Sequence, residues 1–200
     1  MIVNTHNDWD PLEEIIVGHA HHSRIATDIS ANSFGYATLK PHELPPAGPY
    51  PQWVIDEANE DADGLANTLT KMGVKVHRPK IIDWENVEYD IGQGWKSKGW
   101  YSWCPRDCIL PLGDMLIETP SPVRARYFEN RLYEDIMYEA FEDGAMWLQA
   151  PRPKLHDDLY QFEDIIGKPT LLDHEIIFDA PNIVRVGKDL LYQVSNSGNM

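Results

Sequence analysis

The chain is short of cysteine, of positive charge and of long apolar runs, and each shortage excludes a class of protein. Its 200 residues contain only two cysteines, Cys104 and Cys108, so a disulfide scaffold is not expected and a reducing cytoplasm fits. Lys and Arg number 17 against 32 Asp and Glu, which gives a net charge of −15. A nucleic-acid backbone needs clustered Lys and Arg, so no nucleic-acid partner is expected. The acidic balance favours solubility and also permits attraction of a cationic substrate.

Membrane-spanning and targeting segments are not visible in the sequence. No run approaches the roughly 18 apolar residues of a spanning helix, and the start, MIVNTHNDWD, has neither the basic residues nor the apolar core of a signal peptide. Hydrophobic residues make up 42% of the chain and include seven Trp and nine Tyr, which indicates a folded protein with a sizeable core. We therefore expect a cytoplasmic protein with one domain over residues 1–200 and no membrane partner.

The first half of the pattern is strand, helix, strand. The apolar run LEEIIVGHA (12–20) predicts a strand. In residues 52–73, apolar side chains recur at helical spacing, and Gly73 is a suitable stop; they are Val54, Ala58, Ala62, Leu65, Leu69 and Met72. The alternating VKVHRP (74–79) then predicts a second strand.

The same order returns further along the chain. DCILPLGDMLIETP (107–120) predicts two strands joined by a turn at Gly113-Asp114. Residues 123–144 predict one continuous helix, with Ser121 as its N-cap, Pro122 at its first position and Gly144 as its stop. AMWLQAP (145–151) predicts the closing strand.

A third copy begins near the end of the sequence. NIVRVGKDLLYQ (182–193) resembles the earlier strand pair, with its turn at Gly187-Asp189, but no helix and no closing strand follow it. A unit of strand, strand, helix, strand that recurs every ~70 to 80 residues predicts a radial or stacked array of modules. We place the modules at about 1–80, 100–155 and 174–200, the last one truncated. The final strands are then expected to expose apolar faces, unless a dimer partner covers them.

Two aspartates stand just ahead of the repeated strand pairs. Asp107 precedes the second pair and Asp179 the third. If the modules surround an axis, equivalent ends converge, and two carboxylates there would bind a cation such as a guanidinium, whose planar N–H donors match carboxylates. The alternative is that each Asp only caps a turn, as Asp does routinely.

The histidines and cysteines give no clear metal or nucleophile pattern. His19, His21 and His22 lie close in sequence but lack the further ligands of a zinc site. Cys104 and Cys108 would act as nucleophiles only beside a base that lowers the thiol pKa, and no residue near them in the sequence supplies one. His156, in KLHDDLY, is expected in an exposed loop. No metal site is predicted.

Four long stretches resemble the amidinotransferase family of guanidine-modifying enzymes, which includes arginine:glycine and inosamine-phosphate amidinotransferases. The stretches are HNDWDPLEEIIVG, CPRDCILPLGDMLIETPSPVRARYFE, APRPKLHDDLY and FDAPNIVRVGKDLLYQVSNSGN. The resemblance runs from about Val3 to Asn199, and the bacterial inosamine-phosphate branch looks most similar. A complete member is roughly twice as long, so the resemblance is to the N-terminal half.

The resemblance implies an α/β fold, the five-bladed α/β-propeller (pentein), of which about two and a half ββαβ modules are present. It implies transfer of the amidino group of L-arginine to an acceptor amine, glycine or an inosamine phosphate, through an amidino-cysteine, with release of ornithine. No cofactor is implied, because the cysteine carries the amidino group. Asp107 corresponds to the substrate-binding Asp of the family's PRD motif. Asp179 corresponds to the catalytic Asp of its FDA motif, which orients and charge-stabilises a His.

The family's catalytic His and nucleophilic Cys match nothing in this sequence and correspond to positions beyond Met200. We therefore expect the chain alone to be inactive. It is a fragment, a split-enzyme subunit that needs a complementing C-terminal half, or a non-catalytic guanidine-binding remnant; a homodimer is also open. An arginine deiminase-like hydrolase is a further alternative, against which the CPRD, RARYFE and FDA strings argue.

Overall fold

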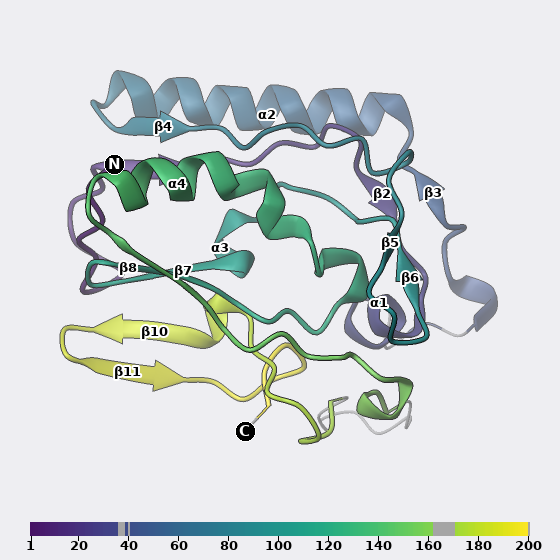
Figure 1. Cartoon of the computed structure of the whole chain (residues 1–200). Coiled ribbons are helices and arrows are strands. Elements are labelled where there is room, and N and C mark those ends of the chain that lie inside the picture. The colour runs from purple at the N-terminus through teal and green to yellow at the C-terminus, as the bar shows by residue number, and fades with distance from the viewer. Residues whose placement is uncertain (36–38, 40, 162–170, 200) are drawn as a thin grey trace.

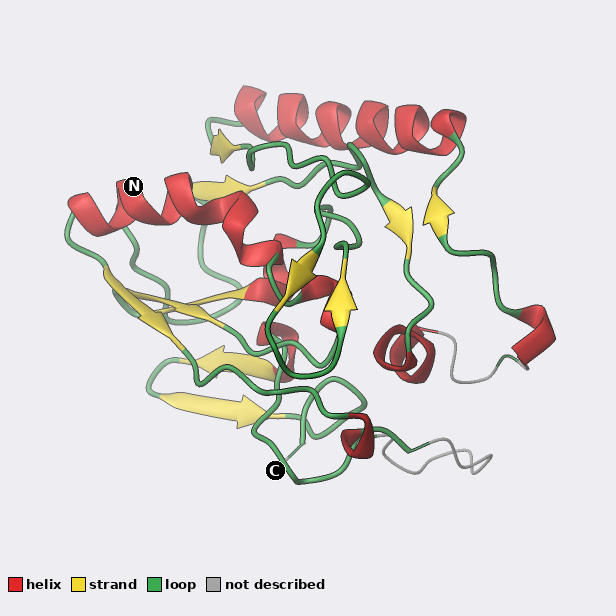
Figure 2. Cartoon of the chain, turned by 45° about the vertical axis from the view of Figure 1, so that its right-hand side comes forward, coloured by secondary structure: helices red, strands yellow, loops and turns green. Residues whose placement is uncertain are grey.

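The computed structural model describes residues 1–35, 39, 41–161 and 171–199, and they form a mixed α/β protein (Figures 1 and 2). The helices are α1 (Ile29–Gly35), α2 (Gln52–Lys71), α3 (Pro105–Cys108) and α4 (Glu134–Glu142). Short 3-10 turns are η1 (Pro41–Glu43), η2 (Arg124–Arg126), η3 (Glu129–Tyr133), η4 (Asp157–Leu159) and η5 (Ala180–Asn182). The strands are β1 (Glu14–Ile16), β2 (Arg24–Ile25), β3 (Gly48–Pro49), β4 (Lys75–His77), β5 (Tyr89–Asp90), β6 (Lys96–Ser97), β7 (Ile109–Leu112), β8 (Met115–Glu118), β9 (Met146–Gln149), β10 (Ile183–Val186) and β11 (Asp189–Tyr192).

The strands form separate small sheets. β1 pairs in parallel with β4, and β7, β8 and β9 form a three-stranded sheet in that order, with β8 and β9 parallel. The remaining pairs, β2 with β3, β5 with β6 and β10 with β11, are antiparallel. Over the described ranges these sheets form no closed ring, so the five-bladed propeller stays a prediction, as do the module boundaries.

The first predicted unit is confirmed, with one change in the buried face of its helix. α2 connects the parallel strands β1 and β4, and Gly73 follows it with a positive φ of 90°. Ile55 is the buried residue of α2, while Leu65 and Met72 are 52% and 73% exposed. The predicted stripe was therefore wrong at these two positions, because the covered face is offset towards Ile55.

The second unit contains the predicted strands but not the predicted continuous helix. β7 and β8 are joined at Gly113, which has a φ of 59°, and β9 closes the sheet. The predicted helix over 123–144 is broken into η2, η3 and α4. Val123 is still extended at φ −98° and ψ 119°, so helical backbone begins only at Arg124. The Ser121 N-cap was therefore wrong.

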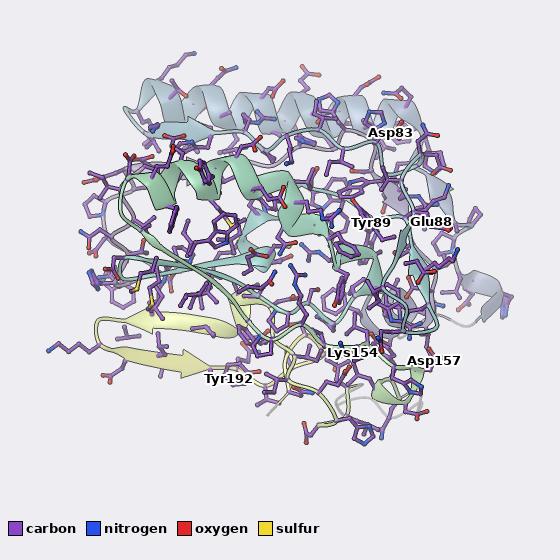
Figure 3. All side chains as sticks on the ribbon, in the orientation of Figure 1. Asp83, Glu88, Tyr89, Lys154, Asp157 and Tyr192 are labelled. Atoms are coloured by element: carbon purple, nitrogen blue, oxygen red, sulfur yellow. The ribbon has the colours of Figure 1, made fainter. Side chains whose placement is uncertain are left out.

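The third unit is the antiparallel hairpin of β10 and β11, as predicted. It lies at the lower edge of the molecule in Figure 1, and no described element covers its lower side. Figure 3 labels Tyr192 on β11 at this edge. Apolar side chains are accordingly exposed on it, including Val184 at 40% and Leu191 at 60%.

The N-terminal segment ties the second and third units together. Thr5 bridges to Gly113 at the β7–β8 turn, and Asn7 bridges to Val186 at the end of β10. Arg185 pairs with Asp8 and donates to the carbonyl oxygen of Pro111 in β7, at 2.8 Å. These contacts fix the β10–β11 hairpin against β7 and so set where Asp179 lies.

The core is divided between the units. The largest cluster surrounds Trp84, Tyr133 and Met137 beneath α4, and a second surrounds Leu155, Leu159 and Ile177. Within the described part of the chain, no helix combines the length and the apolar character that crossing a bilayer would need. The cytoplasmic location stays a prediction.

Candidate functional site

Asp107 lies in the single turn of α3, directly ahead of β7. Pro105 opens this turn, and the hydroxyl of Thr119 donates to the carbonyl oxygen of Asp107 at 2.7 Å. The Asp107 side chain is 24% exposed. Its Oδ2 accepts a hydrogen bond from Nη1 of Arg126 at 2.7 Å. The carboxylate is therefore held by a buried cation from a distant turn.

Asp179 lies directly ahead of η5 and β10 and is only 2% exposed. Its backbone N–H is bonded to the carbonyl oxygen of Ser197 and to Oδ1 of Asn182, both at 3.0 Å. Oδ1 of Asp179 is buried and has no hydrogen-bond partner among the described residues. Burial raises the pKa of this carboxyl to about 7, with Arg126 acting against the rise and Asp107 adding to it. Such an acid is poised for a partner cation or proton donor near neutral pH.

The structure brings the two aspartate turns together. α3 packs against η5, and Nη2 of Arg106 donates to the carbonyl oxygen of Ile183, the residue that follows η5, at 3.1 Å. The negative charge of Asp107 contributes to the raised pKa of Asp179. The two turns are thus neighbours, as their equivalent positions in the repeat predicted. Their catalytic and substrate-binding roles remain proposals.

Sequence reasoning missed the pair that accompanies these aspartates, Arg126 and Glu129. Both side chains are 1% exposed, and Nε of Arg126 donates to Oε2 of Glu129 at 2.5 Å. A signal for the pair was present, because opposite charges three residues apart meet on a helical turn. The predicted helix pattern, however, considered only the apolar positions and assigned no role to Arg126 or Glu129.

The two cysteines have the opposite of activated surroundings. Burial, and then the neighbouring Asp107, raise the pKa of Cys104 to about 11. Burial raises the pKa of Cys108 well above its ordinary value, and Glu129 adds to the rise. Neither thiol is a competent nucleophile in this arrangement, which agrees with the sequence reasoning.

The histidines occupy structural positions. His19 is buried, with Nδ1 2.9 Å from the Ser102 hydroxyl and Nε2 3.2 Å from the Lys80 carbonyl oxygen. His156 lies in an exposed segment, as predicted, and accepts from the Asp158 N–H. Across residues 1–35, 39, 41–161 and 171–199, no group of His, Cys, Asp and Glu has the geometry to hold a metal ion.

Two comparisons with known proteins agree, and a third finds nothing. The chain is 44% identical over 200 residues to inosamine-phosphate amidinotransferase 1 of Streptomyces glaucescens, covering 99% of this chain and 57% of that protein. It is 34% identical over 213 residues to the mitochondrial glycine amidinotransferase of Xenopus tropicalis, covering 98% of this chain and 50% of that protein. No family model matches.

Solved structures show the same relationship. An inosamine-phosphate amidinotransferase from Streptomyces griseus superimposes with a TM-score of 0.90 at 41% identity, covering 98% of this chain and 56% of that one. An amidinotransferase of the saxitoxin biosynthetic pathway from Microseira wollei gives 0.88 at 34% identity, covering 98% and 56%. The chain therefore spans about half the length of the relatives that it matches.

Proposed function

Because the chain belongs to the amidinotransferase family by homology along nearly all of its own length, we propose that it supplies the guanidinium-binding part of an enzyme that moves an amidino group from L-arginine to an acceptor amine. The observation that carries this proposal is the pair of neighbouring turns with Asp107 partly exposed and Asp179 buried with an unpartnered oxygen.

The two aspartates have different surroundings and take different roles in this proposal. Asp107 is accessible and paired with Arg126, so it binds the substrate guanidinium by charge-assisted hydrogen bonds. Asp179 is buried, and its free oxygen accepts the N–H of an imidazole supplied by the part of the enzyme that this chain lacks. A cation there brings the Asp179 pKa down again, because opposite charge favours the ionised form.

The reaction proceeds in two steps that regenerate the nucleophile. A cysteine thiolate, also supplied by the remaining part, attacks the guanidinium carbon of arginine. The bond from that carbon to the side-chain nitrogen breaks, the nitrogen takes a proton, and ornithine leaves an amidino-cysteine behind. The acceptor amine then attacks the same carbon and gives up a proton, the carbon–sulfur bond breaks, and the thiolate returns. Neither Cys104 nor Cys108 fits this role, since both have raised pKa values.

The acceptor is proposed to be an aminocyclitol phosphate rather than glycine. Identity to the inosamine-phosphate enzymes reaches 44%, against 34% for the glycine enzymes. Glycine remains the second candidate, because the comparisons cover only about half of either relative.

The remaining part of the enzyme is proposed to dock on the open side of the β10–β11 hairpin. A hollow of about 410 Å³, lined by Ile176, Phe178, Ile183 and Tyr192 among others, opens beside this hairpin. Ile176 is 65% exposed. An apolar hollow next to the Asp179 turn suits a complementing chain, or a second copy of this one, that completes the site.

The test is an ornithine assay with three mixtures. All three contain arginine and an inosamine phosphate. The first contains only the pure chain, and the second adds the separately expressed remaining part of the Streptomyces griseus relative. The third is the same as the second, except that this chain carries Asp179→Asn. We expect ornithine only in the second mixture. Ornithine from the pure chain would contradict the proposed inactivity, and citrulline in place of ornithine would indicate a hydrolase. Failure of the second mixture, with no arginine binding by the pure chain, would overturn the proposal.

A further inference from the structure

The guanidinium of Arg126 makes more contacts than are needed to neutralise its positive charge. Nε and Nη2 donate to the two carboxylate oxygens of Glu129 at 2.5 and 2.9 Å. Nη1 donates to Oδ2 of Asp107 at 2.7 Å. The Tyr101 ring lies beneath the guanidinium, with 4.9 Å from Cζ to the ring centroid. The plane of the guanidinium is therefore fixed on its edge and on its face.

The bond to Asp107 is not needed to neutralise Arg126. Glu129 is a buried, bidentate partner, and a buried arginine with one such carboxylate is already paired. Asp107 is partly exposed and would be solvated without Arg126. The hydrogen bond from Arg126 Nη1 therefore acts on Asp107: it occupies Oδ2 and leaves Oδ1 without a hydrogen bond from the described residues.

We propose that Arg126, held by Glu129, is a positioning residue for the guanidinium site: it fixes Asp107 through one oxygen and presents the other to the substrate. This inference rests on the proposed function, since it deepens the role of Asp107 and Asp179 in binding a guanidinium. The chain's own guanidinium orients the carboxylate that is to receive the guanidinium of the substrate.

The charges that face Asp179 make the inference measurable. Arg126 favours its ionised form, and a hydrogen bond from the Ser121 hydroxyl does the same. Asp107 and Glu129 disfavour the ionised form, in addition to burial. Removing the positive charge of Arg126 therefore raises the pKa of Asp179, and removing the negative charge of Glu129 lowers it. Loss of packing alone would not move the pKa in opposite directions in the two variants.

The experiment follows the 13Cγ resonances of labelled aspartates during a pH titration of the whole 200-residue chain. Arg126→Met is expected to move the Asp179 midpoint upward by about 1 pH unit or more, and Glu129→Gln to move it downward. Arg124→Met is the matched control, because Arg124 lies in the same turn, is also buried and pairs with Asp157 instead. The control is expected to leave the midpoint at about 7.

An arginine titration on the same samples separates this inference from the proposed function. Arg126→Met is expected to weaken arginine binding at least tenfold, while Arg126→Lys, which keeps the charge but not the fork, weakens it without moving the Asp179 midpoint far. If Arg126→Met does not fold, Glu129→Gln tests the downward shift of the Asp179 midpoint, and Arg126→Lys tests the loss of arginine binding.

The outcomes are distinguishable. Equal midpoints in Arg126→Met and Arg124→Met, or equal arginine affinity in Arg126→Met and the unchanged chain, would overturn the positioning role while leaving the proposed function standing. Opposite midpoint shifts in a chain that binds no arginine would instead support the coupling of Arg126 to Asp179 and count against arginine as the ligand.

Discussion

At the scale of single residues, Asp179 carries an unpartnered buried oxygen, and this is expected to cost stability. Its folded pKa of about 7 lies above the ordinary value of 3.8. A raised pKa means that the folded state binds the proton more tightly than the unfolded chain does. The associated stability is present at low pH and is lost as the pH rises from about 4 to about 7.

Asp179→Asn is therefore expected to stabilise the isolated chain at pH 8 by roughly 2–4 kcal/mol and to be close to neutral near pH 4. Urea unfolding at both pH values measures the difference. Asp107→Asn is the control, because Asp107 is partly exposed and paired with Arg126, and it is expected not to stabilise. A pH-independent effect of Asp179→Asn would show that the carboxyl is ionised without cost.

His19 gives the opposite dependence on pH. Burial, and then the nearby positive charges of His21, Arg78 and His22, lower its pKa to about 4, against a bond to the Lys80 carbonyl oxygen that raises it. The unfolded chain therefore binds this proton more tightly, so stability is full above pH 6.5 and falls as the pH drops towards 4.

We expect His19→Gln to lose less stability than the unchanged chain between pH 6.5 and pH 4.5, by on the order of 2 kcal/mol. Circular dichroism during urea titrations at the two pH values tests this. The exposed His156→Gln is the control and should behave like the unchanged chain. If His19→Gln lost as much stability between pH 6.5 and pH 4.5 as the unchanged chain, groups other than His19 would cause the loss.

At the scale of elements, local turn chemistry was easier to predict than the length of helices. α2 ends where Gly73 predicts, and both hairpins turn at the predicted glycines, because a positive φ at Gly113 and Gly187 is a local requirement. The continuous helix over 123–144 was wrong, because its periodicity says nothing about the extended backbone at Val123 or about the buried partners that hold its first turns. Asp107 and Asp179 could be identified as candidate site residues from their equivalent positions in the repeat. Arg126 and Glu129 were not, since a buried ion pair and an exposed one look alike in sequence.

Gly99 provides a test at this scale. Its φ is +103°, and an added Cβ would lie 2.3 Å from Cε3 of Trp84, a fully buried ring. Gly99→Ala is expected to destabilise by about 2 kcal/mol or more, from strain and displacement of that ring. Gly64→Ala, within α2 and with nothing near the added Cβ, should stabilise by about 0.5–1 kcal/mol. Thermal unfolding measures the change in stability of the two variants. Equal changes in Gly99→Ala and Gly64→Ala would contradict the close packing of Gly99.

At the scale of the whole molecule, the open side of the β10–β11 hairpin governs behaviour in solution. Val184 and Leu191 face each other across the hairpin and are exposed, within a chain whose net charge is −15. The charge opposes association, whereas the apolar face favours it.

We expect the isolated chain to bind a fluorescent apolar dye and to lose most of that signal in Val184→Thr with Leu191→Thr. Leu65→Thr on α2, which removes an apolar residue that is 52% exposed from another face, should leave the signal unchanged. Adding the remaining part of the Streptomyces griseus relative should quench the dye in the unchanged chain and in Leu65→Thr. If Leu65→Thr lost the dye fluorescence instead, the apolar surface that binds the dye would lie on α2.

The contact between Asp8 and Arg185 also has a consequence during biosynthesis. The two residues are 177 positions apart, so the ribosome must add the intervening chain before they can meet. At about 5–20 residues per second, Asp8 waits roughly 10 to 35 s for Arg185 to be added. For that interval the N-terminal segment can bridge only to the β7–β8 turn, through Thr5 and Gly113, so the β10–β11 hairpin is the last element to be fixed against it.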